Sequence, residues 1–185
     1  WDGIVPVQHA REFPGSATIV AYLAAVAHLF LLFAATQPAL AIPPGPLFAV
    51  LALINLAIGT AALYLRRGSL MIVAGIASQI VAIAWAAQSS AAPWPNVALA
   101  LGGGIAAWTI AWYLLARTND FGRAAVSALF LGHVVAIVAG VTSGVPLFTT
   151  LLTTHLALAV AMLAIAWTTE THVLATFLVP VLAIA

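Results

Sequence analysis

The chain has 185 residues, of which 65% are hydrophobic and 5% are charged, and its formal net charge is +1. A water-soluble domain carries about 25% charged residues, so this composition excludes a soluble globular protein and indicates a chain that folds in lipid. The near-neutral charge argues against nucleic acid as a partner, and the absence of cysteine removes disulfides, thiolate nucleophiles and cysteine-ligated metals.

Long apolar runs, bounded by proline, glycine and charged residues, predict membrane-spanning helices. A helix needs about 20 apolar residues to cross the hydrocarbon of a bilayer, and the period-2 alternation of a membrane barrel is absent. We therefore expect an all-α polytopic transmembrane bundle with six complete spans at 17–36, 47–65, 69–88, 96–116, 124–144 and 147–167. Segment 1–16 is predicted to be a cytoplasmic or interfacial lead-in, and 173–185 to begin a seventh helix. Both ends suggest a piece of a longer polypeptide.

The arginines predict the orientation of the spans. Four of the five lie in the connections at 66–68 and 117–123, whereas the alternate connections are uncharged. The positive-inside rule places arginine-rich connections in the cytoplasm, and Arg11 then lies on the same side. We expect a bacterial inner (cytoplasmic) membrane protein whose N-terminus is cytoplasmic. In the second of these connections, Asp120 is expected near the start of the fifth helix.

A polar residue recurs at one depth in every second helix. The segments HLFLLFAATQ from His28, QIVAIAWAAQ from Gln79 and HVVAIVAGVT from His133 align without a gap, at offsets of 51 and 54 residues. Successive copies enter the membrane in the same direction. The pattern predicts three parallel hairpin repeats, at 17–68, 69–120 and 121–172.

Two stretches, NLAIGTAALYLRRGSLMIVAGIASQIVAIAW at 55–85 and THLALAVAMLAIAWTTETHVLA at 154–175, carry a family resemblance. The chain resembles the large bacterial predicted multi-pass membrane proteins of unknown function that are built from repeated transmembrane helix hairpins. The resemblance implies that the chain is a fragment of such a protein. It implies no activity, substrate or catalytic residue.

No Asp, Glu, Lys or Arg lies inside the six predicted spans, which counts against proton relays, ion-coupled carriers and voltage sensors. We predict no catalytic residue and no enzyme. Three histidines lie near mid-membrane: His28, His133 and His155. Two imidazoles at one depth on neighbouring helices can ligate a haem iron or hold a chlorophyll-type pigment. The alternative is that each imidazole, like Asn55 and Gln79, hydrogen-bonds across a helix interface, with no cofactor.

Small residues at four-residue spacing predict close helix packing. They are Ala128, Gly132, Ala136 and Gly140 in the fifth helix, and Gly103, Ala107 and Ala111 in the fourth.

Three functions fit these observations. The first is a non-enzymatic scaffold or accessory membrane component whose partners are the lipid bilayer and other membrane subunits. The second is an electron-transfer or pigment-binding subunit that uses His28, His133 or His155. The third is a carrier for an uncharged or lipidic substrate, which requires a polar cavity lined by Asn55, Gln79 and the threonines of the sixth helix.

Overall fold

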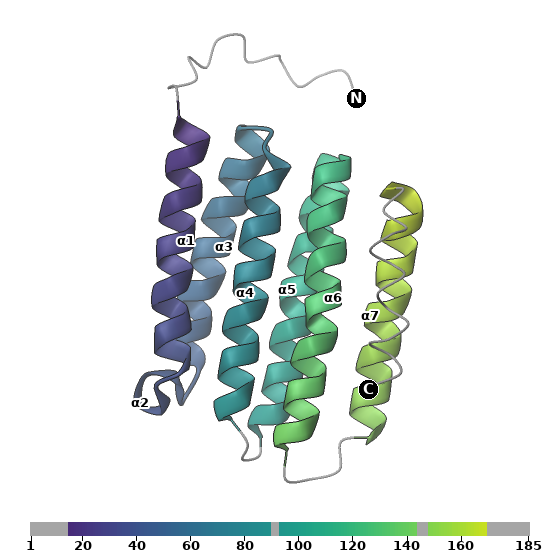
Figure 1. Ribbon diagram of the computed structural model, residues 1–185. Coiled ribbons are helices and arrows are strands. Elements are labelled where there is room, and N and C mark those ends of the chain that lie inside the picture. Colours follow the sequence, from purple (N-terminus) through teal and green to yellow (C-terminus); the bar gives the residue numbers. More distant parts are fainter. Residues whose placement is uncertain (1–14, 90–92, 144–147, 170–185) are drawn as a thin grey trace.

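The computed structural model describes residues 15–89, 93–143 and 148–169, and these residues form seven helices (Figure 1). The helices are α1 (Ser16–Ala35), α2 (Pro38–Ala41), α3 (Gly45–Tyr64), α4 (Gly68–Gln88), α5 (Trp94–Ala116), α6 (Asn119–Thr142) and α7 (Phe148–Thr169). All except α2 are long and apolar enough to cross a membrane. The six predicted spans are therefore confirmed. The predicted seventh helix at 173–185 and nearly all of the lead-in lie outside the described residues.

One helix boundary and one additional helix differ from the prediction. The helix α6 begins at Asn119, five residues before the predicted start at 124, because Thr118 is extended and ends the connection. Asp120 then lies in the first turn of α6, as expected, where a carboxylate favours the positive end of the helix dipole. The four-residue α2 was not predicted. It begins with Pro38, which suits a first helical turn because that position needs no backbone N–H.

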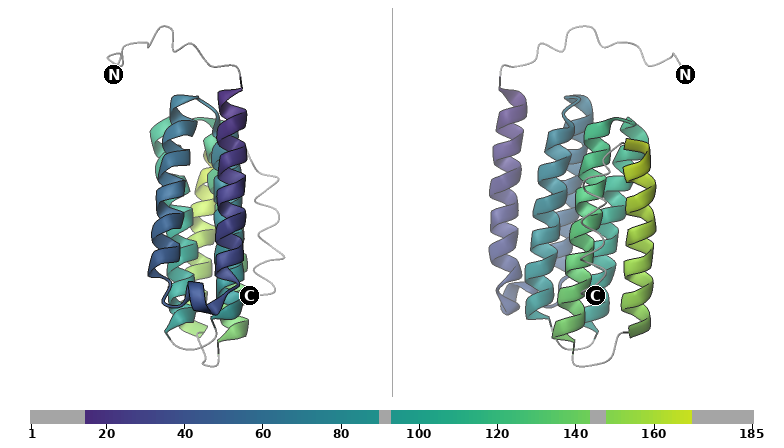
Figure 2. Two further views of the ribbon diagram at one scale, coloured as in Figure 1. Left: turned by 90° about the vertical axis from the view of Figure 1, so that its left-hand side faces the viewer. Right: turned by 45° about the vertical axis from the view of Figure 1, so that its right-hand side comes forward.

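The long helices run alternately up and down, and α1, α4 and α6 form one row with α3 and α5 in a second row (Figures 1 and 2). The helix α7 lies at the far end, beside α6. Burial follows this arrangement, because 56% of the span residues are buried in α4 and α6, against 28% to 33% in the other four. The pair α4 and α6 is thus the centre of the bundle.

The two short connections at the upper end of Figure 1 have the same backbone form. Arg66, with φ 52°, follows α3, and Arg117, with φ 53°, follows α5. Both are left-handed residues that end a helix, a conformation usually taken by glycine. Arg67 and Arg123 lie at the same end, so this end holds every charged side chain of the described residues, Asp120 included.

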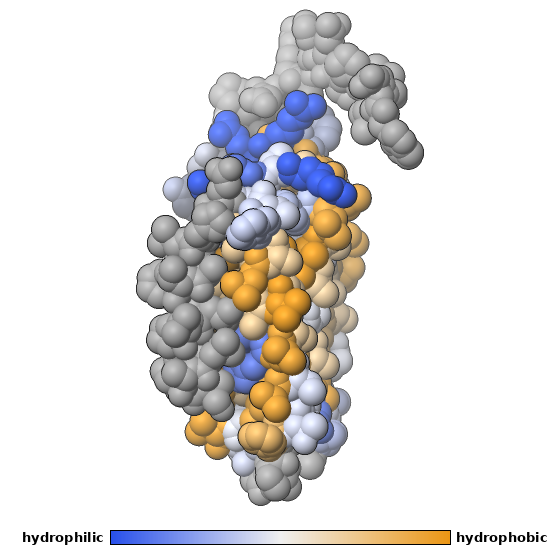
Figure 3. Space-filling view, turned by 90° about the vertical axis from the view of Figure 1, so that its right-hand side faces the viewer, coloured by the Kyte–Doolittle hydropathy of each residue, from blue (hydrophilic) through white to orange (hydrophobic). Residues whose placement is uncertain are grey.

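The surface between the ends is apolar. On the face drawn in Figure 3, hydrophobic side chains run along the length of the bundle and most hydrophilic ones gather at its upper end, with a smaller hydrophilic patch lower down. Large hydrophobic residues such as Phe30, Leu53 and Leu156 are more than half exposed. This surface suits acyl chains and not water, so the chain is an integral membrane protein.

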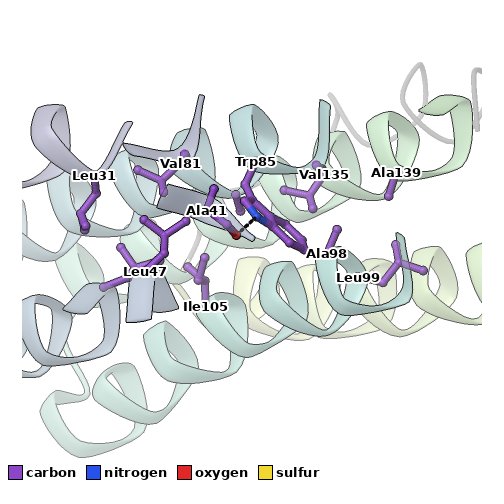
Figure 4. Packing of buried hydrophobic residues seen from close by; sticks show 14 of the residues in the cluster. Leu31, Ala41, Leu47, Val81, Trp85, Ala98, Leu99, Ile105, Val135 and Ala139 are labelled. Carbon is purple, nitrogen blue, oxygen red and sulfur yellow. Dashed lines mark hydrogen bonds between the residues drawn. The ribbon is translucent and has the colours of Figure 1, made fainter. Parts of the chain in front are cut away.

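The core at the opposite end is built around Trp85, which is fully buried (Figure 4). Its indole Nε1 donates a hydrogen bond to the carbonyl oxygen of Ala41 at 3.0 Å, and its ring meets the ring of Phe48 edge-on. These contacts connect α4 to α2 and α3. The indole therefore fixes the connection between α1 and α3 against the bundle.

The small-residue prediction is right for α6 and wrong for α5. In α6, Ala128, Gly132 and Ala136 are buried. In α5, Ala107 and Ala111 are exposed, and a Cβ added at Gly103 would meet no atom within 4 Å. The packed face of α5 instead carries Ala98, Gly102 and Ala106, one residue away around the helix. The Gly102–Gly104 run supplies small residues on adjacent faces, so sequence spacing alone did not identify the packed one.

Candidate functional site

A chain of hydrogen bonds joins three helices near mid-membrane. His28 on α1 lies with Nε2 3.1 Å from Ser78 Oγ on α4, and Ser78 Oγ lies 2.9 Å from Oδ1 of Asn55 on α3. His28 Nδ1 lies 2.8 Å from the carbonyl oxygen of Ala24, one turn earlier in α1. All three side chains are at most 5% exposed. This chain realises the predicted alternative in which His28 and Asn55 bond across helix interfaces.

The proton count fixes the direction of this chain. The carbonyl of Ala24 can only accept, so His28 Nδ1 carries a proton. Ser78 has one hydroxyl proton. If Ser78 gave it to the Asn55 oxygen, His28 Nε2 would have to donate as well, which requires a charged imidazolium at mid-membrane. A buried charge there costs several kcal/mol.

A neutral His28 satisfies every contact if the Asn55 amide is turned over, an exchange of O and N that leaves its shape unchanged. The amide nitrogen of Asn55 then donates to Ser78 Oγ, and Ser78 donates to His28 Nε2. As the structure places the amide, Oδ1 of Asn55 is the atom that faces Ser78 Oγ.

The second polar cluster pairs His133 on α6 with His155 on α7. Their Nδ1 atoms lie 2.8 Å apart, and both residues are buried. The ring planes are inclined by only 8°, with centroids 5.1 Å apart. With the two Nδ1 atoms 2.8 Å apart, a centroid separation of 5.1 Å is close to the largest possible. The two nitrogens therefore lie between the ring centres, and the rings meet edge to edge. One Nδ1 therefore donates to the other in a nearly straight hydrogen bond.

In this geometry the two Nδ1 atoms bond to each other and do not hold a metal between them. Metal bonds to imidazole nitrogen are about 2.0–2.1 Å, so a metal bound to both Nδ1 atoms would hold them farther apart than 2.8 Å. His28 lies apart from this pair, bonded through both ring nitrogens. Among the described residues, no three His, Asp or Glu side chains gather as a metal site.

Gln79 is bonded to backbone. Its Nε2 donates to the carbonyl oxygens of Gly102 on α5, at 3.1 Å, and of Ala128 on α6, at 2.8 Å. Its Oε1 is buried without a partner among the described residues, as is Nε2 of His133. Gln79 therefore connects the central helices at the sequence position that aligns with His28 and His133.

Asn55 and the threonines of α7 line different grooves. Asn55 lines a groove between α3 and α5, while Thr150 and Thr154 line another between α5 and α7. Gln79 lines neither of these two. Both grooves are lined mainly by apolar side chains.

The residue that sequence reasoning missed is Ser78. It connects His28 to Asn55, although serine is common in transmembrane helices and carries no distinctive spacing. The one available signal was its place beside Gln79, which aligns in sequence with His28 and His133. Comparison of the chain with protein-family models, curated proteins and solved structures finds no match.

Proposed function

We propose that the chain is a non-enzymatic scaffold unit within a larger multi-pass protein of the bacterial inner membrane. One observation carries this proposal: the mid-membrane polar side chains bond to other helices. Ser78, Gln79 and His133 each connect their own helix to at least one neighbour. Such bonds stabilise helix association in lipid.

The arrangement of the helices supports the proposal of parallel hairpin repeats. The first helix of each proposed repeat, α1, α4 or α6, lies in the same row (Figure 1). The connections that end the first two repeats share a left-handed arginine, Arg66 or Arg117. A family built from repeated hairpins, which the sequence resembles, would extend such a row.

The charge distribution supports a cytoplasmic N-terminus. The connections with Arg66 and Arg117 lie at the end of the bundle where α1 begins (Figure 1). Because the chain has no cysteine, single introduced cysteines report orientation cleanly. We expect a membrane-impermeant maleimide to label Gln37→Cys from outside intact cells, and Thr118→Cys only after the cells are opened. Both positions are exposed. The reverse labelling pattern would overturn the orientation.

The scaffold role is tested against the cofactor role by an absorption spectrum. The protein is purified in mild detergent from cells that make haem and, in a second preparation, from cells that make chlorophyll-type pigments. We expect no Soret band and no pigment band in stoichiometric amount. A Soret band that disappears in His133→Ala, while Gln79→Ala retains it, would replace the scaffold proposal with the electron-transfer one.

A further inference from the structure

Positive charge is concentrated in two short segments at the upper end of the bundle in Figure 1. Arg66 and Arg67 lie between α3 and α4, and Arg117 and Arg123 lie where α5 leads into α6. All four residues are exposed. Asp120 is the one acidic residue that the structure describes at this end, so the described residues there carry an excess of three positive charges. We call these four arginines the arginine surface.

The two segments of the arginine surface are in direct contact. A Cβ added at Gly68, the first residue of α4, would lie 3.0 Å from the backbone carbonyl carbon of Asp120 and 3.1 Å from the backbone nitrogen of Phe121. Gly68 follows Arg67 directly in the sequence, and Asp120 belongs to the first turn of α6. The arginines of the two segments therefore surround one point of contact and form a continuous basic surface.

Most of the guanidinium donors have no partner among the described residues. Arg123 Nη1 lies 3.9 Å from Asp120 Oδ1, at the limit of an ion pair, and both side chains are more than half exposed. Such a pair contributes little. Arg117 donates through Nε to the carbonyl of Leu114, and this bond does not use its two terminal nitrogens. The arginine surface is therefore available to an anion.

Two of the arginines keep their charge at the cost of backbone strain. Arg66 and Arg117 are both left-handed, with φ near 52°, a conformation that glycine adopts without steric cost. Glycine at either position would relieve the strain but remove the charge. Residues held in such conformations occur often at binding sites, so the two positions support a binding role for the arginine surface.

The helix surface next to these arginines is apolar and exposed. Leu63 precedes Arg66 by three residues on α3, and Leu115 precedes Arg117 by two residues on α5. Both leucines are exposed. A ligand at this end therefore meets positive charge and an acyl-facing surface on the same helices. A phospholipid has parts that fit both, whereas a soluble phosphate fits only the arginines.

We propose that the arginine surface binds the phosphate of one anionic phospholipid, whose acyl chains lie against the exposed leucines beside it. A guanidinium can donate two parallel hydrogen bonds to phosphate oxygens. Clusters of about four or more arginines or lysines next to a membrane span are typical of sites for anionic lipids. A zwitterionic lipid fits less well, because its cationic group is repelled by the same arginines. This binding role goes beyond the scaffold role and does not depend on it.

The test is native mass spectrometry of the full chain in detergent, with equal amounts of phosphatidylglycerol and phosphatidylcholine that carry identical acyl chains. The measured quantity is the ratio of the two adducts that contain one lipid. We expect phosphatidylglycerol to be preferred by about fivefold for each arginine that contacts the phosphate. Soluble glycerol phosphate should not displace the lipid, because it lacks the acyl chains.

Three variants separate a local site from the effect of overall charge. Arg67→Gln should lower the ratio by about fivefold. Asp120→Asn should raise it by up to about fivefold, a gain that loss of folding cannot produce. The third variant combines Arg67→Gln with Gln37→Arg, which restores the net charge at an exposed position of the opposite end. Its ratio should stay as low as that of Arg67→Gln alone.

Equal adducts of the two lipids in the unmodified chain would overturn the proposal. A ratio restored by Gln37→Arg would show that net charge alone attracts the lipid, and it would overturn the location of the site. Displacement of the lipid by glycerol phosphate would mean that the arginines bind a soluble phosphate. None of these results would bear on the scaffold proposal, which the absorption spectrum tests separately.

Discussion

Replacing Ser78 by alanine isolates the hydrogen bonds that join α1, α3 and α4. The serine is fully buried, and its hydroxyl contacts both His28 and Asn55. Alanine lacks only the oxygen atom, so loss of packing is a small term. Each interhelical hydrogen bond in a membrane protein contributes about 0.6 kcal/mol on average and up to about 1.7 kcal/mol. Ser78→Ala is therefore expected to lower the free energy of unfolding by about 1–3 kcal/mol.

The assay is equilibrium unfolding in mixed micelles with increasing mole fractions of dodecyl sulfate, followed by helical circular dichroism. Thr60→Ala is the matched control, because Thr60 is exposed and its hydroxyl donates only to the Leu56 carbonyl of its own helix. We expect this control to change stability by no more than about 0.5 kcal/mol. If Ser78→Ala cost no more than the control, the bonds from His28 to Asn55 would not hold the helices together.

Three further predictions use the same unfolding assay. Gly59→Ala should lower stability by about 1–3 kcal/mol, because the added Cβ would collide with the indole of Trp112. Gly103→Ala should be neutral, or stabilising by up to about 1 kcal/mol, because alanine has the higher helix propensity and the added Cβ meets no atom. Equal effects of the two variants would contradict the close approach of α3 and α5. Gln79→Met removes two hydrogen bonds to helix carbonyls, but it also removes a buried oxygen that has no partner among the described residues. We therefore expect it to lower the free energy of unfolding by less than Ser78→Ala does. A larger loss of stability would show that the Gln79 oxygen is satisfied. Arg117→Gly should stabilise the protein by about 1 kcal/mol, because glycine adopts the left-handed conformation without steric cost. Destabilisation would mean that the lost hydrogen bond from the guanidinium to the Leu114 carbonyl outweighs the relief of backbone strain.

Hydropathy was sufficient to predict the six spans, because lipid requires long apolar helices regardless of how they pack. Most predicted ends lie within two residues of those observed. The exception is α6, where the polar sequence at 117–123 suggested a connection although the helix already begins at Asn119. Polar residues at the membrane surface are compatible with either structure, so composition could not separate them.

The contacts of the polar residues were less predictable than their depth. The helices that carry His133 and His155 are neighbours, as the short stretch of sequence between them implies. The role of Ser78 and the packed face of α5 depend on how each helix is rotated about its axis. The spans are apolar almost all round, so the sequence gives little indication of that rotation.

The unequal burial of the helices has a consequence for how the bundle comes apart. The central helices α4 and α6 hold over half of their span residues inside the protein, whereas α1 and α7 hold 28% each. Regions with fewer buried contacts open at lower free energy than the global transition. The outermost spans are thus expected to detach first into the surrounding lipid, still helical, while α4, α5 and α6 remain associated until the final step.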